Sequence, residues 1–117
     1  MPEPLLRVET PLGKIVVCTH ETWINHIEFG HPVMKGNSEN VKETLKNPIV
    51  VYGSDQKENR DIYFAKSTYN NIGNEFYTKV VVENREIDSI VVSAWPQKDV
   101  AGGIDEEAIK YVNPKLR

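Results

Sequence analysis

The sequence predicts an α+β domain: an amino-terminal β-hairpin and two helices packed on a four-stranded antiparallel sheet, with a short carboxy-terminal helix. Three observations support this class. Two short β-type runs fill 5–18, apolar residues at helical spacing follow between 19 and 46, and β-rich runs joined by turns occupy 49–95. Helices that precede a meander of consecutive strands are typical of a helix layer on one face of a sheet.

The first predicted element is the hairpin. Its β-type runs, Leu5–Glu9 and Lys14–Cys18, are separated by a turn that contains Pro and Gly. A helix is predicted next, over 19–29, because Thr19 can cap its amino terminus and apolar residues recur there at helical spacing. Gly30 is a typical stop signal, so the helix is expected to end before it.

A second helix is predicted from Asn37 or Ser38 to about Lys46. Val41 and Leu45 are four residues apart in it and are expected to face the core together. The β-rich runs that follow predict the four strands of the sheet: Ile49–Tyr52, Ile62–Ala65, Phe76–Val82 and Ser89–Trp95. Turn-forming residues separate these runs, so consecutive strands are expected to pair antiparallel.

The carboxy-terminal segment, 96–117, is predicted to be a loosely attached tail or a short helix. After the flexible Gly102-Gly103 pair, Ile104, Ala108 and Tyr111 recur at helical spacing. A chain of 117 residues is of ordinary size for one domain, so the whole chain is expected to fold as a single unit.

Composition restricts the classes of function. The single cysteine, Cys18, excludes an internal disulfide, and its apolar neighbours predict a buried side chain. Apolar runs such as Ile90–Val92 are too short to span a bilayer, and Met1–Pro4 lacks the features of a signal peptide, so we expect a cytoplasmic protein without a membrane partner. The net charge of −3 is not that of a strongly basic nucleic-acid binder, so any RNA site would be a local positive pocket.

Several motifs occur in an order that resembles a known family. They are Trp23-Ile24-Asn25-His26-Ile27, His31-Pro32, a capped helix ending at Asn47-Pro48, and the strands Tyr63-Phe64-Ala65-Lys66, Tyr77–Val82 and Val91–Trp95. This ordered set covers residues 14 to 96 and resembles the phage-associated nucleases of the barnase–EndoU–colicin–RelE group. The resemblance implies helices packed against a four-stranded antiparallel sheet, and cleavage of RNA without a metal. Members of that group also occur as toxins or as domains attached to phage proteins.

Metal-free cleavage of RNA requires proton transfer from the ribose 2′-OH and to the leaving 5′-oxygen, with hydrogen-bond donors around the phosphate. Histidine suits both transfers because an imidazole gains and loses a proton near neutral pH. With the resemblance, we expect His26 and His31 to share the acid–base duty, and Lys66 and Ser93 to hold the scissile phosphate. His20, at the predicted helix start, is expected to be a surface residue.

Other residues are candidates for RNA contacts. Arg60 and Lys79 could bind phosphates, and Tyr63, Tyr69 and Trp95 could stack on unpaired bases. The core is the commoner location for a residue such as Tyr63, which makes Trp95 the better stacking candidate. The three histidines are spaced by six and five residues, which does not place two of them on one helical face, so neither a metal site nor another cofactor is expected.

The sequence therefore predicts a metal-independent endoribonuclease that acts on tRNA or single-stranded RNA, with an inhibitor or antitoxin protein as a further partner. Two alternatives stay open: an RNA- or protein-binding module of the same fold without catalysis, and a structural accessory domain of a phage or mobile-element protein. Geometry separates them, because an enzyme requires His26, Lys66 and Ser93 to converge on one cleft.

Overall fold

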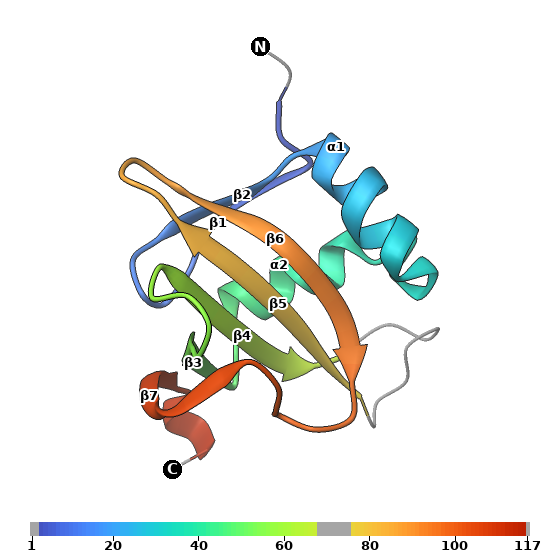
Figure 1. Cartoon of the computed structure of the whole chain (residues 1–117). Helices are drawn as coiled ribbons and strands as arrows, with labels where there is room; N and C mark the ends of the chain where they lie inside the picture. The colour runs from blue at the N-terminus through green and yellow to red at the C-terminus, as the bar shows by residue number, and fades with distance from the viewer. Residues whose placement is uncertain (1–2, 68–75, 117) are drawn as a thin grey trace.

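The computed structural model describes residues 3–67 and 76–116, and within them seven strands form one mixed sheet (Figure 1). The sheet order is β1-β2-β6-β5-β4-β3-β7. The strands are β1 (Leu6–Glu9), β2 (Ile15–Cys18), β3 (Val50–Ser54), β4 (Arg60–Lys66), β5 (Tyr77–Asn84), β6 (Ser89–Gln97) and β7 (Ile104–Val112). The helical segments are α1 (His20–Thr22), the π-helix η1 (Trp23–Glu28), the 3₁₀ turn η2 (Pro32–Met34), α2 (Ser38–Lys46) and the 3₁₀ turn η3 (Pro114–Leu116).

The prediction of a four-stranded antiparallel sheet carrying a separate hairpin and two packed helices is wrong. The hairpin belongs to the sheet, because β2 pairs in parallel with β6 through Val16↔Ser89 and Val17↔Ile90. At the other edge β3 pairs antiparallel with β7, where a helix was predicted. Both edges of the predicted four-stranded sheet are thus extended by strands that satisfy backbone N–H and C=O groups left open by the smaller sheet.

Strand β7 shows why its sequence was read as helical. Ile104, Ala108 and Tyr111 are partly buried in it, as is Val112, whereas Asp105 and Glu107 are exposed. This spacing fits a helix, but here it results from an irregular strand whose register against β3 shifts twice. The helix prediction is therefore wrong here, because the backbone that carries these residues is extended and bulged.

The two amino-terminal helical segments differ in how they match the prediction. The helix expected over 19–29 is a short α1 followed by η1, with Thr19 Oγ1 accepting from the Thr22 N–H at 3.1 Å. Of the three apolar residues at helical spacing, Trp23 and Ile27 are buried in it, whereas Ile24 is 56% exposed. The second helix is confirmed as α2 over Ser38–Lys46. No helix in 3–67 or 76–116 is long and apolar enough to cross a membrane.

The sheet has one face packed against helices and one face that carries a pocket. In Figure 1 α2 lies behind β4, β5 and β6, and α1 lies beside β6. Val41 and Leu45 of α2 form the core with Tyr63 of β4 and Val80 of β5. Since side chains alternate along a strand, the residues between these core positions point to the opposite face. Tyr69 and the predicted turn at 70–74 lie outside the described residues.

Candidate functional site

A pocket of about 460 Å³ opens on the face of the sheet opposite α2. Its lining combines cationic, polar, aromatic, aliphatic and glycine residues. They come from the end of β3, from β4, β5 and β6, and from the connections β3–β4 and β6–β7. These are Ser54, Gln56, Arg60, Ile62, Lys79, Val81, Val92, Ser93, Trp95, Gly102 and Gly103. Four of the sequence-predicted residues, Arg60, Lys79, Ser93 and Trp95, therefore come together in one concavity.

Alternation in β4 and β5 places the cationic residues on this face. Arg60 and Ile62 of β4 line the pocket, whereas the alternate residues Asp61 and Tyr63 are buried on the opposite side. Arg60 pairs with Glu83 of β5, and its Nε and Nη2 donate to one Glu83 carboxylate oxygen at 3.4 and 3.3 Å. Both side chains remain about a quarter exposed (26% and 23%), so the guanidinium keeps donors that can face a bound anion.

A bulge in β6 turns Ser93 toward the pocket. Val81 pairs with Ser93 and the next residue, Val82, pairs with Val91, so Val92 has no partner in the ladder. Bulges re-aim side chains, and here Val92 and Ser93 both line the pocket while Ala94 returns to the core. Within 3–67 and 76–116 the Ser93 hydroxyl has no hydrogen-bonding partner, which leaves it open to a ligand.

Trp95 lies at one end of the pocket and is held from two sides. Its Nε1 donates to Gln97 Oε1 at 3.1 Å, and the His31 ring stacks on it with centroids 5.2 Å apart and planes at 23°. His31 is brought there because η1 and η2 pack against β6, and the His31 N–H donates to the Ile27 carbonyl where η1 ends. The stack places the His31 imidazole beside the pocket, although His31 itself does not line it.

Lys79 lines the pocket from the centre of β5 but is only 4% exposed. Burial lowers the pKa of its ammonium, and Asp55 acts in the opposite direction. Its Nζ lies 4.8 Å from the centroid of the Trp95 ring and 5.9 Å from that of Phe64. Lys79 and His31 thus both contact the same indole.

The other predicted residues lie elsewhere. His26 is exposed on η1, and Lys66 is exposed at the end of β4, with its Nζ 5.3 Å from the Tyr77 ring centroid. Neither residue lines the pocket. Tyr63 is fully buried on the helix face, where its hydroxyl donates to Thr10 Oγ1 at 2.9 Å, so its ring is enclosed in the core. His26, Lys66 and Ser93 do not converge.

Cys18 does not contribute a nucleophile to this site. It is buried and lies outside the pocket lining, and burial raises the pKa of its thiol to about 11. In the described part of the chain, no three His, Cys, Asp or Glu side chains are grouped as they would be around a metal ion.

Sequence reasoning missed the wall of the pocket, which we call the strap and define as residues 98–103. Gly102 and Gly103 of the strap line the pocket, and Gln97 ties it to Trp95. The Gly-Gly pair was a usable signal for a tight turn, because both residues have a positive φ of 83° and 71°. No local pattern marks Gln97. Comparisons with protein families, curated proteins and solved structures give no match to this chain.

Proposed function

We propose that this protein is a metal-independent ribonuclease, resembling the phage-associated barnase–EndoU–colicin–RelE group, whose pocket holds one phosphodiester of single-stranded RNA. The observation that carries the proposal is that Arg60, Ser93 and Trp95 line one pocket and His31 stacks on Trp95. A guanidinium and a hydroxyl are donors for phosphate oxygens, and an indole is a platform for an unpaired base.

The proposed reaction uses these groups in distinct roles. The His31 imidazole takes the proton of the ribose 2′-OH, whose oxygen then attacks the adjacent phosphorus. Arg60 and Ser93 donate to the non-bridging oxygens as negative charge builds up on them. The P–O bond to the 5′-oxygen breaks, and that oxygen takes a proton from water, which leaves a 2′,3′-cyclic phosphate. His31 does not line the pocket but stacks on Trp95, which does. His26 and Lys66 neither line the pocket nor stack on a residue that lines it, so the scheme gives them no part.

The test is cleavage of a labelled single-stranded RNA in the presence of a chelator, at several values between about pH 5 and pH 8. We expect a 2′,3′-cyclic phosphate product, and no cleavage where the scissile nucleotide carries a 2′-deoxy group. His31→Ala is expected to lower the rate by roughly 10²–10⁴-fold. His26→Ala is the matched control, since it removes an exposed imidazole from the neighbouring η1 and should leave the rate unchanged. Intact RNA at high protein concentration would rule out the enzyme.

A second candidate function is an RNA-binding module without catalysis. The observation that favours it is that three of the four predicted catalytic residues, His26, His31 and Lys66, do not line the pocket, whereas Arg60 and Trp95 do. Such a module would bind single-stranded RNA with an affinity that falls with salt, and Trp95→Ala would weaken the binding. Binding without cleavage at any tested pH would select this function over the nuclease.

A further inference from the structure

Lys79 is the most enclosed cation in the pocket, and its ammonium already has protein partners. Its Nζ donates to the carbonyl oxygens of Ala101 and Gly102, at 3.2 and 2.6 Å. It also lies above the Trp95 and Phe64 rings. An ammonium has three N–H donors, so two are used by the strap and the third lies among aromatic rings. A phosphate could take Lys79 only by displacing the strap.

The strap is fixed by a second side chain and by the backbone. Gln97 Nε2 donates to the carbonyls of Asp99 and Ala101, at 2.8 and 2.6 Å, while its Oε1 accepts from the Trp95 indole. The N–H of Asp55 donates to the Gly103 carbonyl at 2.9 Å. Lys79, Gln97 and Trp95 therefore form a closed set of contacts around the Ala101 carbonyl.

The close approach of Lys79 also explains the glycine at 102. A Cβ at this position would lie 3.1 Å from Nζ, and its φ of +83° is unfavourable for other residues. The turn at Gly102 thus directs the Ala101 and Gly102 carbonyls toward the Lys79 ammonium. Burial lowers the pKa of Lys79, which agrees with an ammonium that is shielded from water and is not accessible to a ligand.

Arg60 differs from Lys79 in each of these respects. Its side chain is 26% exposed, its protein partner is the Glu83 carboxylate of the neighbouring β5, and its planar guanidinium has five donors, two of which bond Glu83. We propose that Lys79 is a positioning residue that locks the strap and orients Trp95 for stacking, and that Arg60 is the cation that contacts the phosphate of a bound RNA. The RNA part of this inference rests on the proposed function.

The first measurement uses the free protein and needs no ligand. In ¹H–¹⁵N spectra, Lys79→Met should shift the Trp95 indole signal and the Gly102 and Gly103 amide signals. Lys66→Met is the matched control, because it removes the same charge from an exposed lysine on the same sheet face. It should leave these three signals in place. Indole and strap signals unmoved by Lys79→Met would overturn the positioning role.

The second measurement separates phosphate contact from positioning. Binding of a fluorescein-labelled single-stranded RNA of about eight nucleotides is followed by anisotropy between about 50 and 300 mM salt. Arg60→Gln should reduce the slope of log K against log salt by ~0.7, the value for one phosphate contact on a single strand. Lys79→Met should weaken binding about tenfold at every salt concentration, as for the loss of one stacked base, and leave the slope unchanged.

A slope reduced in Lys79→Met as much as in Arg60→Gln would overturn the division of roles. If Lys79→Met does not fold, Gln97→Leu tests the same lock from the other side of the strap. It should shift the indole and strap signals and weaken binding without a change of slope. If the wild-type protein binds no RNA, the proposed function fails, and the spectra of the free protein still decide whether Lys79 positions the strap.

Discussion

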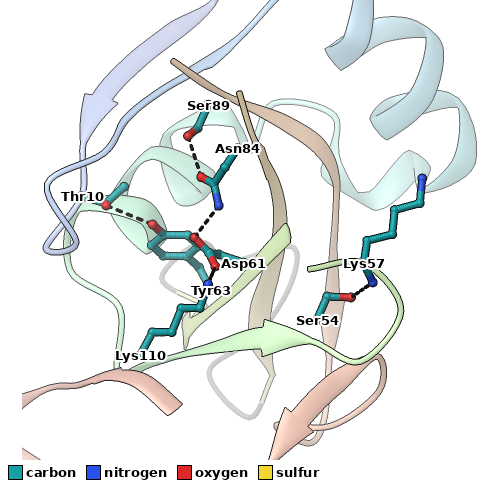
Figure 2. A network of polar contacts seen from close by, with 8 residues as sticks. All are labelled: Thr10, Ser54, Lys57, Asp61, Tyr63, Asn84, Ser89 and Lys110. Atoms are coloured by element: carbon teal, nitrogen blue, oxygen red, sulfur yellow. Dashed lines mark hydrogen bonds and ion pairs between the residues drawn. The ribbon is translucent and has the colours of Figure 1, made fainter. Parts of the chain in front are cut away.

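The two faces of strands β4 and β5 use polar residues in opposite ways. On the helix face, Asp61 is 1% exposed and accepts from Asn84 Nδ2 at 2.9 Å and from the Lys110 ammonium of β7, while Ser89 Oγ donates to Asn84 Oδ1 at 2.7 Å (Figure 2). On the pocket face, the adjacent Arg60 is partly exposed. Residues one position apart thus belong either to a closed network or to an open site.

This difference indicates that polar residues on the helix face contribute to stability and that those on the pocket face are available for binding. In the network, each buried polar group is matched by another, which is the condition for burying charge without a large cost. Lys110 reaches Asp61 across Gly53, where a Cβ would lie 3.5 Å from the lysine Cε. The network therefore fastens β7 to β4. In the pocket, donors of Arg60 stay available at the cost of weaker pairing.

The largest effect on stability is expected from breaking the network at Lys110. Lys110→Met leaves the buried Asp61 carboxylate with Asn84 but without its cation, and should lower the free energy of unfolding by about 2–3 kcal/mol. Urea unfolding measures this. Lys115→Met removes an equally charged but exposed side chain and should change stability little. Equal losses in both variants would mean that the network does not hold β7.

Much of the fold was readable from local patterns, and the errors have a common cause. Helix α2 and the central strands follow from apolar spacing, whereas the helix expected from Ile104, Ala108 and Tyr111 is strand β7. The parallel pairing of β2 with β6 and the strand character of β7 depend on open sheet edges, which are formed by segments distant in the sequence. Periodicity does not encode these edges.

The candidate site shows the same limit. Arg60 and Lys79 share a face because of the period of two along β4 and β5, which a sequence can predict. Ser93 reaches that face only through the unpaired Val92, and no pattern in the sequence marks this bulge. His26 was grouped with Ser93 by family resemblance alone, and the exposed surface of η1 carries it away from the pocket.

A smaller effect is expected at Tyr63, also on the helix face. Desolvation by burial raises the pKa of Tyr63 from 10.0 to about 12, and the nearby Asp61 charge acts in the same direction. The folded state thus favours the protonated phenol. The contribution of the protonated Tyr63 phenol to the free energy of unfolding is complete below pH 10 and is lost as the pH rises toward about 12.

Tyr63→Phe removes the hydroxyl that donates to Thr10, and should cost about 1 kcal/mol near neutral pH. The stability difference between wild type and Tyr63→Phe should shrink as the pH rises above 10, because unfolded Tyr63 ionises first. Urea titrations of both proteins at matched pH values measure this difference, and the comparison cancels the titration of the other groups. A difference that stays constant up to pH 11.5 would show that the Tyr63 phenol is not held protonated by the fold.

The smallest stability effect is expected on the pocket face, at the partner of Arg60. Glu83→Gln should change the free energy of unfolding by no more than about 0.5 kcal/mol, because the pair is partly exposed to water. The same variant should tighten binding of single-stranded RNA roughly threefold, since it removes a carboxylate from beside the phosphate and releases donors of Arg60. Glu86→Gln removes the same charge from an exposed turn and is the control for net charge alone. Equal gains in affinity for Glu83→Gln and Glu86→Gln would attribute the effect to net charge. A loss of stability in Glu83→Gln comparable to that of Lys110→Met would mean that the two faces do not differ as we infer.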